Sequence, residues 1–303
     1  MCIRDSNGGY GRNTCSHITL ATNCNGDSPG PPSPNRPFVN FTADGVLTVL
    51  GSQGSDTLDI ARGDSGYVVT SSIVPEVRGC ATSGTRTVCD DSRARVNSII
   101  VYGNSGNDSI TIDYSVPADT YTLIDAGNGD NVVKGGKTSD YIATGHGNSR
   151  LEGRDGHDVI TPGLASRTTV LGGSGHDVIK TENPCLGHSI SGGSGKDNVV
   201  MARSDFGIHV DLGKGFIKRN GGGSCNPTKL AADIEDAEGS RYNDIFVASR
   251  RGSGFLGRQG IDSFLTRDGR GNDSIITGPG GRKNRISRDP GDKLVYGWGL
   301  ARA

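Results

Sequence analysis

Short apolar runs that alternate with polar positions dominate the chain from Phe38 onward. Segments such as VLTVL, GYVVTSS and NSIIVYG lie between Phe38 and Ile112, and glycine or aspartate separates them. Runs of this length and period, rich in β-branched residues, are typical of half-buried strands. Only KLAADIEDAEG, at 229–239, has the pattern of a helix. The pattern therefore predicts a β-rich chain with at most one short helix.

A nonapeptide of consensus G-G-x-G-x-D-x-U-x, in which U is a large apolar residue, recurs along the chain. Two stretches match it at every position, GGSGHDVIK at 172–180 and GGSGKDNVV at 192–200. Copies with one or two departures begin at Gly51, Gly103, Gly135, Gly153, Gly257 and Asp268. A fixed short period of this kind indicates a repeat architecture rather than a conventional globular core.

The repeat itself predicts the geometry of the coil. Its glycines permit a tight turn, and the x-U-x that follows is long enough only for a brief strand with one inward side chain. Two repeats make one coil, and the strands of successive coils stack about 4.8 Å apart. We therefore expect an all-β fold, a parallel β-roll or β-solenoid with an N-terminal β-rich segment.

The expected organisation has four parts. Residues 1–37 form a truncated leader and a Pro-rich linker, and residues 38–120 form the N-terminal β-rich segment with a disulfide turn. Residues 121–205 form a first block of the roll, and residues 206–303 contain an interrupting segment and a C-terminal roll block.

The sixth position of the repeat is the candidate metal ligand. In such a stack, aspartates of alternate repeats lie about 5 Å apart and repel by roughly 3 kcal/mol at a surface-like dielectric. A calcium ion with oxygen ligands at about 2.3–2.6 Å would fit between them. Loop carbonyls would complete its shell, and the loop glycines considered are Gly153, Gly156, Gly172, Gly173, Gly175, Gly192, Gly193 and Gly195.

In the first roll block the aspartates fall on one side. One edge of the expected roll carries Asp140, Asp158, Asp177 and Asp197. The other edge carries Asn131, Ser149, a position near Arg167, and a loop with Cys185 but no aspartate in register. We therefore expect calcium along one edge only. The alternative is that each aspartate has no metal and only caps its own turn, as Asp does in many loops.

The C-terminal block repeats the spacing. Asp244 and Asp262 are 18 residues apart with Ser253 between them, whereas Asp273 follows after 11 residues and breaks the register. Asp56 and Asp108 have no clear stacked partner in the sequence, so ligand and turn residue remain open for both. Asp244, Asp262, Asp273 and Asp108 complete the predicted metal ligands.

Charge and cysteine content narrow the partners. The chain has 32 Lys and Arg against 33 Asp and Glu, so bulk charge does not favour nucleic acid or an anionic membrane. No apolar run is long enough for a membrane span. Seven cysteines suit an oxidising compartment, and Cys2 is set aside because MCIRDS resembles a translated sequencing adapter. The expected pairs are Cys80–Cys89, Cys15–Cys24 and Cys185–Cys225.

Catalytic patterns are weak. The sequence contains no HExxH, GxSxG or Walker-type loop. His157, His176 and Lys196 should form an exposed row of loop side chains. The acidic cluster of Asp233, Glu235, Asp236 and Glu238 could pair carboxylates for catalysis, but a solvated face is the better interpretation. We therefore do not expect an enzyme.

These motifs resemble the haemolysin-type, or RTX-like, calcium-binding repeats. The resemblance covers roughly 126–200 and 239–276, and VDLGKG with DIEDAEGSRYNDIF looks like the segment that often interrupts such arrays. The N-terminal layout, a GC…C turn followed by NSIIVYGNSGNDSITI, looks like secreted actinobacterial members. The resemblance implies calcium bound by the consensus aspartates and loop carbonyls, folding on calcium binding, and export.

The expected function is a secreted, extracellular calcium-binding module with a structural or interaction role. Its partners would be calcium ions and an extracellular protein or polysaccharide. The first alternative is the C-terminal repeat region of a larger secreted protease, lipase or polysaccharide-modifying enzyme. The second is a carbohydrate- or ice-binding solenoid, although no regular T-x-T or aromatic ladder supports it.

Overall fold

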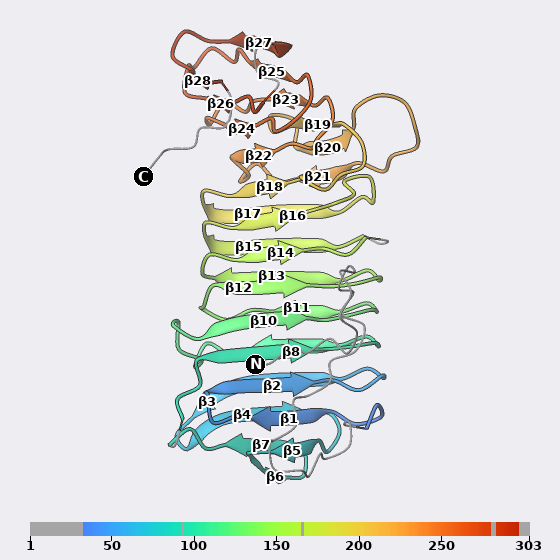
Figure 1. The fold of residues 1–303 in the computed structure, drawn as a ribbon, viewed down its shortest axis with the longest axis vertical. Helices are drawn as coiled ribbons and strands as arrows, with labels where there is room; N and C mark the ends of the chain where they lie inside the picture. Colours follow the sequence, from blue (N-terminus) through green and yellow to red (C-terminus); the bar gives the residue numbers. More distant parts are fainter. Residues whose placement is uncertain (1–32, 93, 165–166, 280–282, 297–303) are drawn as a thin grey trace, which may run out of the picture.

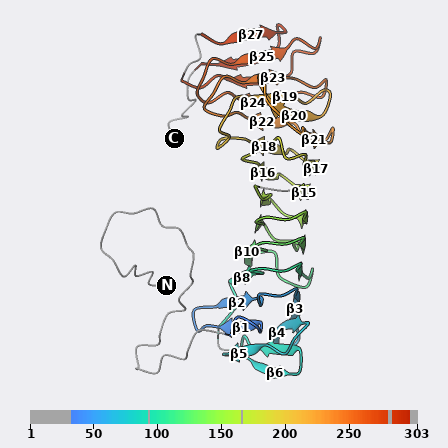
Figure 2. The same ribbon diagram turned by 90° about the vertical axis from the view of Figure 1, so that its right-hand side faces the viewer.

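The fold is an all-β solenoid, as the repeat predicts. A computed structural model describes residues 33–92, 94–164, 167–279 and 283–296. These residues form 28 strands and no α-helix. The strands stack into one long column of coils (Figure 1), which is narrow when seen from the side (Figure 2). The strands belong to two sheets, here called sheet A and sheet B.

Successive strands of the roll alternate between the two sheets, so that each coil contributes one strand to each. Sheet A has 13 strands, in the order β28 (Lys293–Val295), β26 (Ser274–Ile276), β24 (Gly254–Leu256), β22 (Asp236–Glu238), β18 (Asn198–Val200), β16 (Val178–Lys180), β14 (Val159–Thr161), β12 (Asp140–Ala143), β10 (Tyr121–Asp125), β8 (Ser98–Tyr102), β2 (Val46–Leu50), β1 (Phe38–Phe41) and β5 (Glu76–Arg78). Sheet B has 15 strands, in the order β27 (Arg285–Arg288), β25 (Ser263–Thr266), β23 (Ile245–Val247), β19 (Ile208–Asp211), β20 (Phe216–Arg219), β21 (Thr228–Leu230), β17 (Ser189–Gly195), β15 (Thr169–Gly175), β13 (Arg150–Asp155), β11 (Val132–Lys134), β9 (Ser109–Ile112), β3 (Thr57–Gly63), β4 (Gly66–Ser71), β7 (Arg86–Cys89) and β6 (Ala81–Ser83).

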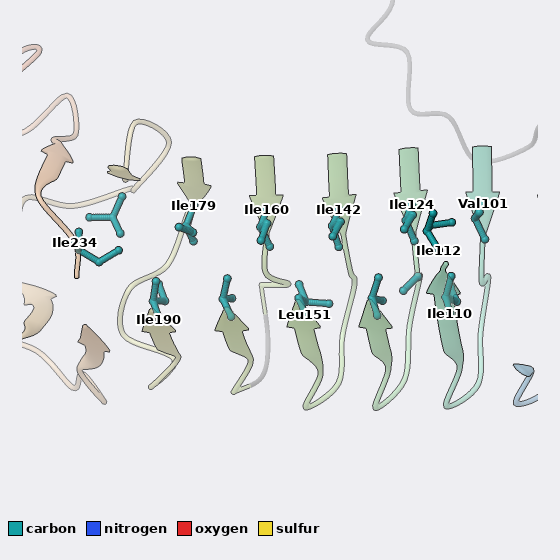
Figure 3. Packing of buried hydrophobic residues seen from close by; sticks show 14 of the residues in the cluster. Val101, Ile110, Ile112, Ile124, Ile142, Leu151, Ile160, Ile179, Ile190 and Ile234 are labelled. Carbon is teal, nitrogen blue, oxygen red and sulfur yellow. The ribbon is translucent and has the colours of Figure 1, made fainter. Parts of the chain in front are cut away.

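The core is a double row of single apolar side chains, one from each short strand. Ile142 pairs in register with Ile160, and Ile160 with Ile179, along sheet A. Leu151 and Ile190 belong to the facing row from sheet B (Figure 3). All five side chains are buried. A core of this thickness explains why a chain with only 32% hydrophobic residues can fold.

The N-terminal β-rich segment stacks directly on the roll. β2 pairs with β8, and β3 pairs with β9, both in parallel. Antiparallel pairings of β1 with β2 and of β3, β4, β7 and β6 with one another finish this end of the stack. The predicted disulfide between Cys80 and Cys89 is confirmed.

The predicted helix at 229–239 is wrong. The segment contains the end of β21 and the whole of β22, which pairs in parallel with β18. Ile234 and Ala237 are buried, whereas most of the polar residues around them are partly or fully exposed. Helical propensity is a weak preference, and the stacking of this coil on its neighbour overrides it.

The roll is interrupted once, between β18 and β22. There sheet B gains β19 and β20, and β20 runs antiparallel to both β19 and β21. A second disulfide, Cys185–Cys225, ties the loop before β21 to the preceding coil and confirms another predicted pair. The predicted pair Cys15–Cys24 lies outside the described residues. Nowhere in the described ranges is there a helix long and apolar enough to cross a membrane.

Substitution in the core tests the stacked arrangement. We expect Ile160→Ala to lower the free energy of unfolding by about 2–5 kcal/mol, because the buried cavity lies between two stacked coils. Val159→Ala, on the partly exposed outer side of the same strand, should cost less than about 1 kcal/mol. Urea unfolding followed by circular dichroism measures both, and equal losses would contradict the assignment of inward and outward positions.

Candidate metal centre

The candidate site is a ladder of carboxylates at the turns, here called corners, that lead into the strands. Each corner aspartate stands two residues before the buried apolar residue of its strand. The backbone N–H of Asp158 donates to Oδ1 of Asp177 at 2.8 Å, and that of Asp177 donates to Oδ1 of Asp197 at 2.8 Å. Asp140 N–H donates to Asp158 Oδ1 in the same way. One carboxylate oxygen therefore ties each coil to the next.

Two such ladders run along the roll, one on each edge. A corners lead into sheet A, and B corners lead into sheet B. The A corners carry Asp140, Asp158, Asp177, Asp197, Glu235, Ser253, Asp273 and Asp292. The B corners carry Asp56, Asp108, Asn131, Ser149, Thr168, His188, Asp244, Asp262 and Asn284.

In the first roll block the aspartates lie along one edge, as the register predicts. In the C-terminal block they lie on both edges. Asp244 and Asp262 lie on the B corners, with Asp244 N–H donating to Asp262 Oδ1 at 2.9 Å. Asp273 lies on the A corners, where Ser253 N–H donates to its Oδ1. The 11-residue step from Asp262 is thus half a coil to the opposite edge, and Asp273 does not break the register.

Several ladder residues were missed or misplaced from the sequence. Asp56 N–H donates to Asp108 Oδ1 at 2.9 Å, so these two are stacked partners although they are 52 positions apart in the sequence. The antiparallel strands inserted between them hide this in the sequence. Asp292 was missed, although it also stands two residues before a core residue, Leu294. Thr168 occupies the corner expected near Arg167.

The second carboxylate oxygen divides the aspartate corners other than Asp292 into two kinds; Oδ2 of Asp292 accepts the Asp289 N–H and the Thr266 hydroxyl. In closed corners, Oδ2 accepts the backbone N–H of the residue four positions earlier. The closed corners are Asp56 with Ser52 (2.6 Å), Asp140 with Gly136 (2.9 Å) and Asp244 with Ser240 (2.7 Å). In open corners, Oδ2 is buried and has no hydrogen-bond partner among the described residues. The open corners are Asp108, Asp158, Asp177, Asp197, Asp262 and Asp273.

The backbone conformation four residues before the aspartate separates the two kinds. At every open corner this residue has a positive φ, and at no closed corner does it. The six residues are Asn104 (72°), Arg154 (76°), Gly173 (122°), Gly193 (104°), Arg258 (64°) and Gly269 (88°). Where this residue has the left-handed conformation, its N–H does not donate to Oδ2, and the carboxylate oxygen has no hydrogen-bond partner.

The predicted loop glycines have distinct roles. A Cβ built on Gly153 would stand 2.0 Å from Asp158 Oδ2 and 2.5 Å from the carbonyl oxygen of Gly172. Gly172 and Gly192 stand in the same way against the Oδ2 atoms of their own repeats. The other predicted glycines all have positive φ values, namely Gly156, Gly173, Gly175, Gly193 and Gly195. The first glycine is thus required by the carboxylate and the others by the turn.

Burial strongly disfavours the charged form of these carboxylates. It raises the pKa of Asp158 and Asp262 to about 8, and that of Asp108 and Asp273 to about 6. Burial also raises the pKa of Asp177 and Asp197. Burial also raises the pKa at two closed corners, that of Asp140 and that of Asp244, the latter to about 6. Burial therefore does not distinguish open from closed corners, whereas the hydrogen bonding of Oδ2 and the φ angle four residues earlier do.

The donor set of an open corner suits a hard cation. It consists of a carboxylate oxygen and backbone carbonyl oxygens, which are the ligands that calcium prefers. No group of three His, Cys, Asp or Glu side chains that could hold a metal occurs within the described ranges. A bound ion would therefore need carbonyl oxygens, such as that of Gly172, beside each aspartate.

The other candidate clusters have simpler explanations. The His157 and His176 rings stack 5.2 Å apart, and His157 Nδ1 accepts the backbone N–H of His176 at 2.7 Å. This confirms the expected row. The four residues of the acidic cluster contact separate partners. Asp233 accepts the Ser191 hydroxyl, and Glu235 accepts the Asp197 N–H. Asp236 forms an ion pair with Lys196, and Glu238 forms one with Arg258.

The raised pKa values predict an unusual pH dependence without divalent cations. A carboxyl that is protonated more readily in the folded state stabilises it at low pH, and this contribution is lost as the pH rises towards 8. Burial lowers the pKa of His188 to about 4, which opposes the trend only below its ordinary value of 6.5. In EDTA we therefore expect Tm to fall by about 5–10 °C between pH 6.5 and 8.5.

The control for this experiment is Asp158→Asn, which removes one of the two groups with a pKa of about 8. Its Tm should depend less on pH over the same interval. A Tm that rises with pH in EDTA would contradict the assignment of these carboxyls as buried and unpaired.

The sequence matches no protein-family model and no curated protein. The functional interpretation of the chain therefore depends on the parallel β-solenoid and on the geometry of its carboxylate corners.

Proposed function

We propose that the protein is a calcium-binding β-solenoid that works outside the cell as a structural or interaction module. One observation carries the proposal, namely the six corner aspartates whose Oδ2 atoms are buried without a hydrogen-bond partner. A buried, unpaired carboxylate destabilises a fold unless it takes up a proton or a cation. At neutral pH a cation ligated by each oxygen would allow the charged form to persist.

The corner chemistry favours calcium over other metals. Zinc prefers sulfur and nitrogen ligands, whereas the open corners offer oxygen. Magnesium usually keeps several of its waters and needs a rigid octahedral shell. Corner oxygens with almost no solvent exposure suit calcium better, because it accepts a flexible shell made of protein oxygens.

The extracellular location is supported by the two disulfides. Cys80–Cys89 and Cys185–Cys225 both suit an oxidising environment. Calcium sites of extracellular modules typically have dissociation constants of about 10⁻⁴–10⁻³ M. We expect this range, because each corner supplies a single carboxylate to an ion. We propose no catalytic role.

A calcium titration of the full chain tests the proposal. We expect far-UV circular dichroism and thermal unfolding to report a calcium-specific gain of β-structure and stability, with magnesium as control. The double variant Asp158→Ala/Asp177→Ala should weaken the response at least severalfold. An identical spectrum and Tm in EDTA and in millimolar calcium would contradict a calcium-dependent fold and leave a constitutive solenoid.

A further inference from the structure

We infer that cations bind at the six open corners and not at the closed corners of Asp140 and Asp244, and that three of the open corners on one edge form a single cooperative site. The inference rests on the proposed calcium-binding function and adds which aspartates carry it. It separates Asp158, Asp177 and Asp197 from Asp140, although all four share the repeat position and the same edge.

At the closed corners of Asp140 and Asp244 neither carboxylate oxygen is free, whereas Asp56 keeps a buried Oδ1 without a hydrogen-bond partner. Asp140 Oδ2 accepts the N–H of Gly136 at 2.9 Å, and Oδ1 accepts the hydroxyl of Thr138. Asp244 is saturated in the same way. Its Oδ2 accepts Ser240 N–H, and its Oδ1 accepts Ile208 N–H and the Ser240 hydroxyl at 2.8 Å each. A cation bound there would displace a buried backbone N–H and leave it without an acceptor, which is costly.

An open corner is held open by its backbone. The left-handed conformation is strained for a residue with a side chain, yet Asn104, Arg154 and Arg258 adopt it. Each is anchored to a distant part of the chain. Asn104 donates to the carbonyl of Gly51 at 2.7 Å, Arg154 donates to the carbonyl of Ile112 at 3.2 Å, and Arg258 pairs with Glu238.

Strain that is maintained by specific contacts is a marker of function. Here it keeps one N–H away from the carboxylate, so that Oδ2 is already free for a ligand. The Arg154 guanidinium also lies over the Tyr114 ring at 5.1 Å, a second contact that fixes this residue.

The open corners differ in their neighbours. Asp158, Asp177 and Asp197 occupy three consecutive A corners and are joined through their Oδ1 atoms. An ion that orders one of them orders the acceptor of the next, so binding along this run should be cooperative. None of the other three open corners has an open corner beside it. Asp108 lies between Asp56 and Asn131, and Asp262 lies between Asp244 and Asn284. Asp273 lies between Ser253 and Asp292, whose two carboxylate oxygens both accept hydrogen bonds. These three corners should bind independently.

Calcium stoichiometry of the full chain, measured by equilibrium dialysis and elemental analysis, tests the inference. Asn is a suitable replacement, because Asn131 already accepts the ladder N–H of Asp108 through Oδ1 at 2.8 Å. We expect Asp177→Asn to lose at least one equivalent of calcium and to reduce the Hill coefficient of the titration. The matched variants Asp140→Asn and Asp244→Asn should keep the wild-type stoichiometry.

A second pair of variants changes the backbone without touching a ligand. Arg154→Gly still permits a positive φ and should retain calcium at the Asp158 corner. Arg154→Val strongly disfavours this conformation and should weaken binding there by about tenfold or more, with the N–H of residue 154 turning to Oδ2. Amide hydrogen exchange and thermal unfolding of both variants in EDTA would establish that each remains folded.

The outcomes separate the two proposals. If no variant and no wild-type sample binds calcium, both the function and this inference fail. If the wild type binds calcium but Asp140→Asn and Asp244→Asn lose as much as Asp177→Asn, the function stands and the distinction between open and closed corners is overturned. Equal affinities of Arg154→Gly and Arg154→Val would also overturn it.

Discussion

The structure depends on buried carboxylates at the corners of the roll. A coil with only one apolar side chain per strand gains little from hydrophobic burial, so neighbouring coils need further connections. The backbone N–H of one corner donating to the carboxylate of the next corner is such a connection. It places a charged group in a site such as that of Asp197, which is 0% exposed. The cost of that burial links the fold to proton or cation binding.

This constraint explains the distribution of residue types along the corners. Where the corner residue is Asn131, Ser149 or His188, the ladder continues through a neutral acceptor. At most of the acidic corners, Asp158, Asp177 and Asp197 among them, the glycine five residues earlier leaves room for the carboxylate. Along the stack, the consecutive acidic corners lie first on one edge and then on the other, so the acidic residues do not all lie on one edge of the roll. The interruption at β19 and β20 lies where the acidic ladder passes from the A corners to the B corners.

Much of the fold was predictable, because a repeat of nine residues with one apolar position admits few structures. The position of Asp158 above Asp177, and the inward direction of Ile160, follow directly from the period. The pairing of Asp56 with Asp108 did not, because an antiparallel excursion through β4, β6 and β7 separates partners that are adjacent in space. Nor did the difference between Asp140 and Asp158, because it depends on the φ angle of one preceding residue. Arg154 gives no sequence signal of a left-handed conformation, which is imposed by its tertiary contacts.

The most direct test of the account is a crystal structure of the calcium-loaded protein, with the ions located by anomalous scattering. The account predicts density peaks at the open corners, with Oδ2 of residues such as Asp158 and Asp262 about 2.3–2.6 Å from an ion. It predicts none at Asp140 or Asp244. Crystals grown in excess calcium that show no ion at any corner, with Oδ2 of Asp158 still buried and unpaired, would contradict it.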